Sequence, residues 1–373
     1  MTANKGLVLP HLPGVITADE VAASAAHLAS LQRPSGMIPW FTNGHCDPWN
    51  HVESAMALDI AGRSAEAELA YDWLAQVQRP DGAWHNYYVG DHDGDRSISE
   101  RKLDTNVCAY VATGAVHHAL CAPSEHERDR RAQQRWPMVN AALSWVLAQR
   151  RSDGLALWAV EEDDRPWDYA LLTGTSSIQH ALRCGAVLAG FCGEDADEWL
   201  QAADHMRDAI TTRPHSFEDK SRWAMDWYYP VLTGALTESA AAARLASGWD
   251  TFIMDGLGTR CVNDEPWVTA SETAETALAF AAIGDVDTAS QLLSWTRSHR
   301  RDDGSYLTGI VHPDRIVFPD GEHTSYTAAA VVLAADSICQ SSPASSLFRF
   351  DLANPFDRGA SQAKLGRRRT LFS

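Results

Sequence analysis

Gln78-Arg79-Pro80-Asp81-Gly82-Ala83-Trp84 is the stretch that decides the fold, because the chain repeats it. Related copies begin at Gln32, Gln149 and His299. Each copy closes an amphipathic segment and leads, through a polar loop, into a more apolar one. In a repeat architecture each unit buries its apolar face against its neighbours, so the units do not fold separately. The 373 residues therefore predict one closed helical domain rather than two.

Two kinds of helix alternate along this repeat. The first kind is charged on one side, as in 20–31, which Thr17 or Asp19 can cap. The second kind is apolar nearly all round, as in 327–338, and a helix of that kind is buried. We expect outer helices at 20–31, 65–77, 136–147, 195–210, 239–249 and 287–298, and inner helices at 52–60, 107–120, 177–189, 230–236, 273–283 and 327–338. The pattern predicts an all-α fold, an (α/α)6 toroid or barrel of six helical hairpins.

The two ends of the chain depart from the repeat. We expect an N-terminal extension at 1–16, the toroid domain at 17–340 and a disordered tail at 341–373, which is rich first in Ser and then in Pro, Gly and Arg without a period. The alternative is that Phe348, Phe350 and Phe356 pack back onto an outer helix.

Charge and composition exclude several classes of function. A net charge of −18 argues against a nucleic-acid partner, whose phosphates need a basic surface. The chain contains no run of 18 apolar residues, so we expect no transmembrane segment, and residues 1–13 do not resemble a signal peptide. Seven scattered cysteines do not suggest a disulfide framework, so we expect a cytoplasmic protein with a small-molecule substrate.

Polar side chains gather where the inner helices start. If the ring closes, these starts meet at one end of a central cavity, where helix N-termini also favour anionic groups. Glu272 and Glu275 are spaced i,i+3, so both can face the cavity as acid or base candidates. The predicted catalytic residues are Glu272, Glu275, Asp226, His51, Glu53 and His323.

Aromatic residues are frequent near the same helix starts, where they can stack on sugar rings or stabilise carbocations. The predicted substrate-binding residues are Trp40, Trp49, Asp104, Trp227, Tyr228, Tyr229, Trp267 and Tyr326. A single Asp at a helix start is by default a cap, and a loop aromatic is as often a packing residue.

Helical hairpins separated by Gln-x-x-Asp-Gly-x-Trp turns resemble the repeat of the terpenoid cyclase and protein prenyltransferase superfamily. Met225 to Pro230 and Pro266 to Thr269 are similar to segments of the actinobacterial prenyltransferase or squalene oxidase repeat proteins. The resemblance covers about residues 17–340 and implies a toroid that acts on an isoprenoid or a related metabolite as a prenyltransferase or cyclase. A repeat of this kind is a guide to fold more than to chemistry.

The catalytic motifs of that superfamily are altered here. The Asp-x-Asp-Asp motif of the cyclases has its nearest match at Glu161–Asp164, in a charged loop. The resemblance to protein prenyltransferases offers Asp104, Cys108 and His323 as zinc ligands, although their spacing differs. Asp91–Asp95 could chelate a magnesium diphosphate, but an exposed acidic loop is the commoner meaning. We therefore expect no metal site and no cofactor, with zinc or magnesium as the minor alternatives.

The cavity composition supports a second class of enzyme. The same toroid hosts glycosidases and sugar 2-epimerases, and Pro48 to Ala55 is faintly similar to an epimerase segment. The alternative function is therefore a glycoside hydrolase or sugar epimerase that uses carboxylates and histidines. A toroid that binds a ligand without chemistry is the second alternative.

Overall fold

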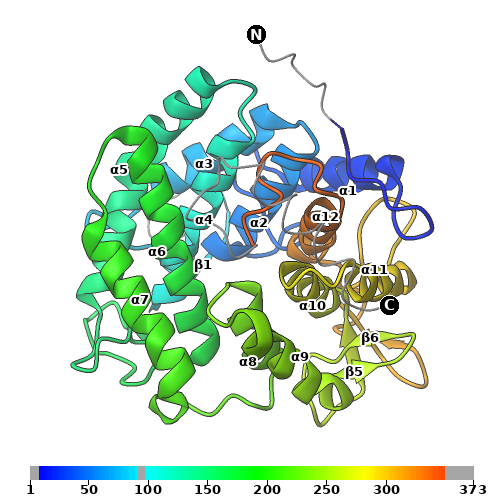
Figure 1. Ribbon diagram of the computed structural model, residues 1–373. Helices are drawn as coiled ribbons and strands as arrows, with labels where there is room; N and C mark the ends of the chain where they lie inside the picture. The colour runs from blue at the N-terminus through cyan, green and yellow to red at the C-terminus, as the bar shows by residue number, and fades with distance from the viewer. Residues whose placement is uncertain (1–7, 91–96, 349–373) are drawn as a thin grey trace, which may run out of the picture.

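The computed structural model describes residues 8–90 and 97–348, and in these ranges twelve α-helices of two alternating kinds follow one another (Figure 1). One kind is buried on nearly every side: α2 (Pro48–Ile60), α4 (Thr105–Leu120), α6 (Leu172–Cys192), α8 (Ala224–Leu232), α10 (Ala270–Ala282) and α12 (Ser325–Cys339). The other kind buries one face: α1 (Ala18–Leu31), α3 (Ser64–Val77), α5 (Glu125–Ala148), α7 (Asp197–Thr212), α9 (Glu238–Phe252) and α11 (Val286–Trp295). The prediction of a mostly helical single domain is confirmed.

The buried helices contact one another in chain order, and the last contacts the first. Helix α2 packs on α4, and each following even-numbered helix packs on the next up to α12, which returns to α2. Along this closed series α4 lies opposite α10, and α6 lies opposite α12. Each partly exposed helix packs outside, as α7 does on α6 and α9 on α8. The hydrophobic core fills the space between the two sets of helices.

The repeated turn fastens one outer helix to the next. Gln78 donates its side-chain amide to the carbonyl of Gly82, 2.9 Å away, and to that of Met138 on α5, also 2.9 Å away. Gln32 makes the matching pair of bonds to Gly36 and to Glu66 on α3. Gly82 has a φ of +99°, and a Cβ there would lie 2.3 Å from the carbonyl oxygen of Ala141. The turn therefore needs Gly for its backbone conformation and for close approach to the neighbouring helix.

The last copy of the turn joins the end of the chain to its beginning. Ser24 on α1 donates its hydroxyl to the carbonyl of Gly304, 2.9 Å away. Thr17 caps α1 through a reciprocal capping box with Glu20, and Arg297 pairs with Glu20 at 3.1 Å. These contacts across the sequence close the outer series between α11 and α1.

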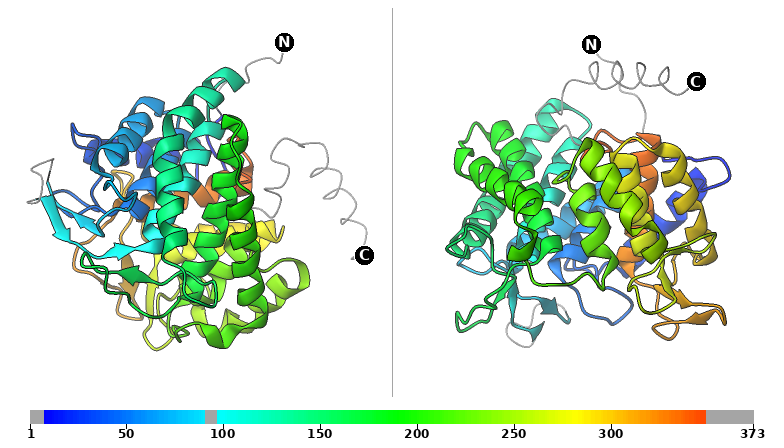
Figure 2. Two further views of the ribbon diagram at one scale, coloured as in Figure 1. Left: turned by 90° about the vertical axis from the view of Figure 1, so that its left-hand side faces the viewer. Right: turned by 60° about the horizontal axis from the view of Figure 1, so that its bottom comes forward.

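The long loops precede inner helices, and those before α4, α6, α10 and α12 carry short strands, which the sequence analysis did not predict. The antiparallel pairs are β1 (Tyr87–Tyr88) with β2 (Ile98–Glu100), β3 (Leu103–Asp104) with β4 (Ala159–Val160), β5 (Ile253–Met254) with β6 (Gly258–Thr259), and the three-stranded order β7 (Trp267–Thr269), β8 (Gly309–Val311), β9 (Ile316–Val317). Figure 2 shows these hairpins and loops gathered at one end of the molecule. Among the described residues, none of the helices has the length and apolar character needed to cross a membrane.

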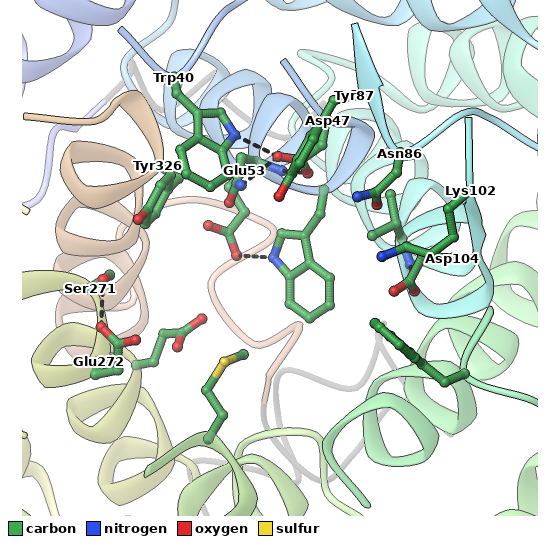
Figure 3. A pocket seen from close by; sticks show the side chains of 16 residues that line it. Trp40, Asp47, Glu53, Asn86, Tyr87, Lys102, Asp104, Ser271, Glu272 and Tyr326 are labelled. Carbon is green, nitrogen blue, oxygen red and sulfur yellow. Dashed lines mark hydrogen bonds between the residues drawn. The ribbon is translucent and has the colours of Figure 1, made fainter. Parts of the chain in front are cut away.

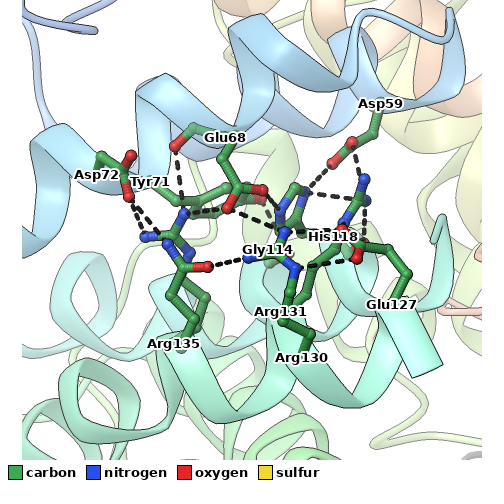
Figure 4. A network of polar contacts seen from close by, with 11 residues as sticks. Asp59, Glu68, Tyr71, Asp72, Gly114, His118, Glu127, Arg130, Arg131 and Arg135 are labelled. Atoms are coloured by element: carbon green, nitrogen blue, oxygen red, sulfur yellow. Dashed lines mark hydrogen bonds and ion pairs between the residues drawn. The ribbon is translucent and has the colours of Figure 1, made fainter. Parts of the chain in front are cut away.

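A buried network of charges joins four helices at the other end of α2 and α4 (Figure 4). His118 on α4 places Nδ1 2.8 Å from the carboxylate of Asp59 on α2 and Nε2 2.8 Å from that of Glu68 on α3. From α5, Arg135 pairs with Glu68 at 3.1 Å, and Arg131 lies 3.7 Å from Asp59. Burial lowers the pKa of His118, but the two carboxylates outweigh it and raise the pKa overall. The two carboxylates thus favour the charged form of the imidazole between them.

The first residues of the predicted tail pack against the ring. The side chain of Asp336 on α12 accepts bonds from the backbone N–H and the hydroxyl of Ser342, at 2.7 and 2.6 Å. Phe348 stacks on His180 of α6, with ring centroids 5.4 Å apart, and His180 Nε2 donates to the carbonyl of Leu347. Residues 341–348 therefore bridge two opposite inner helices, unlike the disordered tail expected for them. Phe350, Phe356 and the rest of that segment lie outside the described residues.

Two helices depart most from prediction. Helix α8 covers 224–232 instead of 230–236, so Pro230 lies near its end rather than at its start. Helix α5 starts at Glu125, capped by Ser124, eleven residues before the predicted start at Trp136. Its first turns are so rich in charge that they show no apolar stripe, which is the signal that the prediction used.

Candidate active site

A cavity of about 360 Å³ opens where the inner helices α2, α4 and α10 begin (Figure 3). The cavity is lined by Trp40, Asp47, Trp49, Asn50, Glu53, Asn86, Tyr87, Lys102, Asp104, Val107, Trp158, Met225, Ser271, Glu272, Glu275 and Tyr326. The predicted concentration of polar side chains at inner-helix starts thus leads to a real cavity. Seven of the fourteen predicted site residues line it: Glu272, Glu275, Glu53, Trp40, Trp49, Asp104 and Tyr326.

Asp47 organises the wall formed by α2. It is the N-cap, followed by Pro at the first helical position, and its carboxylate accepts the backbone N–H of Asn50 at 3.0 Å. The same carboxylate accepts the indole N–H of Trp40 and the side-chain amide of Asn50, both at 2.6 Å. Burial raises the pKa of Asp47, and these donors oppose the rise. Asp47 therefore fixes two cavity side chains while it caps the helix.

Glu53 lies one turn further along α2 and is buried. Its Oε1 accepts the indole N–H of Trp49 at 2.9 Å and the hydroxyl of Tyr110 at 3.2 Å. Burial, followed by the nearby carboxylates of Asp47 and Glu272, raises the pKa of Glu53 to about 7, although both hydrogen bonds act to lower it. A carboxyl with such a pKa carries a proton for much of the time at neutral pH.

Glu272 and Glu275 both project from α10 into the cavity, as the i,i+3 spacing predicted. The Glu272 carboxylate accepts hydrogen bonds from the hydroxyls of Thr269 and Ser271, the latter at 2.7 Å, and from the Cys261 thiol at 3.3 Å. These three donors fix the orientation of the carboxylate.

Glu275 has a different environment, although it lies one turn away. It accepts the hydroxyl of Tyr228. Burial, together with the charges of Glu53 and Glu272, raises the pKa of Glu275 well above its usual value. Glu53, Glu272 and Glu275 therefore form a carboxyl cluster in which two members favour the protonated form.

Asp104 stands across the cavity from Glu272, since α4 and α10 are opposite in the closed series (Figure 3). It is the N-cap of α4, and its Oδ1 accepts the backbone N–H groups of Asn106 and Val107 at 2.9 and 3.1 Å. Burial raises the pKa of Asp104 to about 6, against the effects of Val107 N–H and the Lys102 ammonium. Pairing of β3 with β4 brings Asp104 next to the loop that carries Trp158.

Aromatic rings supply flat walls between these carboxyls. Trp49 stacks on Tyr110, with centroids 4.4 Å apart and an interplanar angle of 11°. Trp40 meets the edge of Tyr326 at 5.1 Å, and the ammonium of Lys102 lies 4.4 Å from the Trp158 ring. Sugar rings bind such faces through their C–H groups, while nearby carboxylates and amides bind their hydroxyls.

Seven predicted residues lie away from the cavity lining, three of them from the catalytic set. His51 is fully buried: its Nδ1 accepts from the backbone N–H of Ile38 at 3.1 Å, and its Nε2 donates to the carbonyl of Ala70 at 2.9 Å. Asp226 accepts the hydroxyl of Thr173 at 2.6 Å. His323 Nδ1 donates to the carbonyl of Gly321. These three side chains bond to other parts of the protein and do not line the cavity. Helical spacing predicts which face of a helix carries a side chain, but not how deeply that side chain is buried.

The other four are packing aromatics. Trp227 donates its indole N–H to the backbone carbonyl of Arg244 on α9 and stacks on Phe252. Trp267 donates to the carbonyl of Phe318 on the three-stranded sheet. Tyr228 and Tyr229 are buried behind the carboxyl cluster, where Tyr228 acts through Glu275.

Several lining residues were missed. Asn50 and Ser271 directly neighbour predicted positions, and their place in a first helical turn was a usable signal. Asn86 and Lys102 come from the β1–β2 region, where both bond to Glu100 at 2.5 and 3.3 Å. Short hairpin loops carry no periodic pattern, so nothing in the sequence indicated these two side chains.

Most of the residues named for the metal alternatives lie within the described part of the chain. Within residues 8–90 and 97–348, no three His, Cys, Asp or Glu side chains are grouped as a metal site. The Cys108 sulfur accepts the backbone N–H of Trp84 at 3.3 Å and is buried. Glu161–Asp164 forms an exposed turn in which Asp163 pairs with Arg165 at 2.8 Å. The Asp91–Asp95 segment lies outside the described residues.

Comparisons with known proteins identify glycosidases. The chain is 43% identical over 342 residues to the MMP endo-(1,4)-3-O-methyl-alpha-D-mannosidase of Mycolicibacterium hassiacum, with 91% of this chain and 92% of that protein covered. Among solved structures, a wild-type glycosidase superposes with a TM-score of 0.68 at 16% identity, covering 87% of this chain and 97% of its own. A GH63 mannosylglycerate hydrolase from Thermus thermophilus, in complex with glucose, gives 0.60 at 13% identity and covers 84% and 99%. No family model matches the chain.

The expected relationship to prenyltransferases and terpenoid cyclases is therefore wrong. A mannosidase at 43% identity overturns it, and the structural neighbours named above are glycosidases. The Gln-x-x-Asp-Gly-x-Trp turn suggested the wrong family because its Gln and Gly hold outer helices together. That role is structural, so enzymes with different reactions can contain the same turn.

Proposed function

The chain belongs to the family of the MMP endo-(1,4)-3-O-methyl-alpha-D-mannosidase, and from this premise we propose that it hydrolyses internal α-(1,4) linkages between 3-O-methyl-D-mannose units. The isoprenoid function expected from the repeat is withdrawn, and the glycoside hydrolase alternative takes its place. We further propose that the twelve described helices form six hairpins of an α/α toroid, each made of an outer helix and the inner helix that follows it.

The observation that carries the proposal is the pair of carboxyls from opposite inner helices. Glycosidases of the common type hydrolyse through two carboxyl groups on either side of the scissile bond. Asp104 caps α4 and Glu272 projects from α10, and the cavity lies between them (Figure 3). A sugar ring bound against Trp49 would have one carboxyl on each side.

Asp104 is suited to be the general acid. Burial raises its pKa to about 6, so a fraction of Asp104 carries a proton near neutral pH. The acid is also still strong enough to give that proton to the leaving oxygen. In the proposed step Asp104 gives its proton to the glycosidic oxygen while the bond from that oxygen to the anomeric carbon breaks. Lys102 then faces the carboxylate that is left.

Glu272 is suited to be the general base. Its carboxylate is oriented by the hydroxyls of Thr269 and Ser271 and by Cys261. It takes a proton from a water molecule as that water bonds to the anomeric carbon from the side opposite the leaving group. Asp104 ends ionised, Glu272 ends protonated, and exchange with solvent restores both, so the reaction is a single displacement with inversion.

Glu53 and Glu275 complete the cavity wall next to Glu272. Because burial and mutual repulsion raise the pKa of both, each favours the form that carries a proton, and a neutral carboxyl can both donate and accept. We assign them to binding sugar hydroxyls. Val107 and Met225 are the two aliphatic side chains of the lining and offer apolar contact to a methyl ether.

A substrate panel tests this function. The purified chain is incubated with α-(1,4)-linked 3-O-methylmannose oligosaccharides, with unmethylated α-(1,4)-mannose oligosaccharides and with prenyl diphosphates, and products are identified by mass spectrometry. The proposal expects shorter oligosaccharides from the methylated series. Turnover confined to prenyl diphosphates, or no turnover in the sugar series, would reject it.

A further inference from the structure

Two exposed indoles stand beside the cavity without a structural role that requires their exposure. Trp167 is 39% exposed and Trp223 is 43% exposed, although large aromatic side chains are usually buried. Trp167 lies in the loop before α6 and Trp223 is the N-cap of α8, so both belong to the end where the long loops gather (Figure 2).

Trp167 continues the cavity wall outward. Trp158 lines the cavity, and the Trp167 ring meets it edge-on at a centroid distance of 4.9 Å. Tyr169 stacks on the same Trp158 at 5.5 Å and 21°. The aromatic surface therefore extends without a break from the cavity to the exposed indole.

Trp223 is a second exposed indole, on the neighbouring loop. The ammonium of Lys220 lies 5.7 Å from the Tyr169 ring, and the backbone N–H of Trp223 donates to the carbonyl of Lys220 at 2.8 Å. Two residues after Trp223, Met225 lines the cavity. The rings in mutual contact are those of Trp158, Trp167 and Tyr169, which we call the aromatic platform. The Trp223 ring lies outside this platform and packs against the guanidinium of Arg222.

The platform is held in place before any ligand arrives. The indole N–H of Trp167 donates to Glu161 at 2.9 Å. The backbone N–H of Glu218 donates to the carbonyl of Ala170 at 2.9 Å, which joins the loops before α6 and α8. A rigid aromatic surface binds with less loss of conformational entropy than a mobile one.

We propose that the aromatic platform is a remote binding site for sugar units of the same chain that is cleaved in the cavity. This proposal rests on the proposed function, because a chain cut at an internal linkage extends beyond the cut. A cavity of about 360 Å³ is near the lower end of the range for a site that encloses one small ligand, so further units must lie outside it. The continuous contact from Trp158 to Trp167 gives them a place on exposed rings.

The test compares short and long substrates. The variants are Trp167→Ala and Trp167→Phe, which keeps a ring. The controls are Trp223→Ala, which removes an exposed indole outside the platform, and Leu200→Ala, which removes an equally exposed apolar side chain from outer helix α7. Each is assayed on the shortest 3-O-methylmannose oligosaccharide that the unaltered protein cleaves and on one several units longer. Thermal melting of each variant checks that it folds.

Trp167→Ala should raise KM for the long substrate about three- to tenfold, in line with the usual strength of aromatic contacts, with kcat little changed, and the two controls should not change KM. Cleavage of the short substrate should not change, and Trp167→Phe should retain most of the affinity. Equal loss on both lengths, or no loss on either, overturns the platform while the proposed function stands. If the unaltered protein cleaves neither length, the proposed function fails and the platform fails with it.

Discussion

Replacement of Glu272 by Gln is the substitution that separates catalysis from stability most clearly. Gln keeps the size of the side chain but cannot accept a proton from water. Loss of a general base typically slows a reaction about 10²–10⁴-fold. We therefore expect kcat to fall by that factor with little change in KM, since the proton transfer happens in the transition state and not in the bound complex.

The cost in stability is small and follows from the three donors on Glu272. Thr269 and Ser271 are hydroxyls, which can rotate to accept from the new amide, and the third donor is the weak thiol of Cys261. Weakening one or two charge-assisted bonds costs about 1–3 kcal/mol. For a chain of this size that lowers the melting temperature by roughly 1–4 °C.

The assay measures release of reducing ends from a 3-O-methylmannose oligosaccharide, next to a thermal melt of the same preparation. Glu275→Gln serves as the matched control, because it changes the neighbouring acid on the same helix that we assign to binding; its effect should be mainly on KM. A Glu272→Gln variant with normal kcat, or one that does not fold at room temperature, would refute the assignment of Glu272 as the base.

Three further outcomes follow from the structure. Because the reaction needs Asp104 protonated, kcat/KM should fall as pH rises through about 6, and a pH profile that is flat from 5 to 8 contradicts this role. His118→Asn should lower the free energy of unfolding by about 3 kcal/mol, since it leaves Asp59 buried without its closest partner. The raised pKa of His118 stabilises the fold fully at pH below about 6.5, and this stabilisation is lost as pH rises through the folded pKa. The deficit measured in urea should therefore shrink as pH is raised above about 6.5, and a constant deficit opposes the charged imidazole. Gly82→Ala should lower the free energy of unfolding by about 2–4 kcal/mol, because φ is positive there and the new Cβ would lie 2.3 Å from a helix carbonyl. Gly193→Ala should lower it by only about 1 kcal/mol, because φ is +74° but nothing lies within 4 Å. Equal losses would show that the close approach to α5 does not matter.

The sequence predicted the parts of the molecule that obey a period. Helices that are apolar on every side are inner helices, and the repeated turn closes each of the four outer helices that it follows. The polar starts of the inner helices correctly indicated where the cavity would be, because Asp, Ser, Thr and Glu side chains at those points cannot be covered by another helix.

The sequence did not predict how deeply individual side chains are buried or how the loops are arranged. His51 is only four residues from Asp47, yet it points between α2 and α3, where it bonds to the carbonyl of Ala70. Asp226 was placed ahead of its helix because Pro230 was taken as the helix start, whereas α8 begins at Ala224. Lys102 depends on the pairing of strands only two or three residues long, which leave too short a pattern to detect.

The most direct test of the central claim follows the cleavage of an α-(1,4)-linked 3-O-methylmannose oligosaccharide by NMR, with the unaltered protein and with Asp104→Asn. The proposed single displacement between Asp104 and Glu272 predicts internal cleavage in which the new reducing end appears first as the β anomer, and a loss of rate of at least about 10²-fold in Asp104→Asn. A first product with the α anomer, or an Asp104→Asn variant as fast as the unaltered protein, would contradict the account.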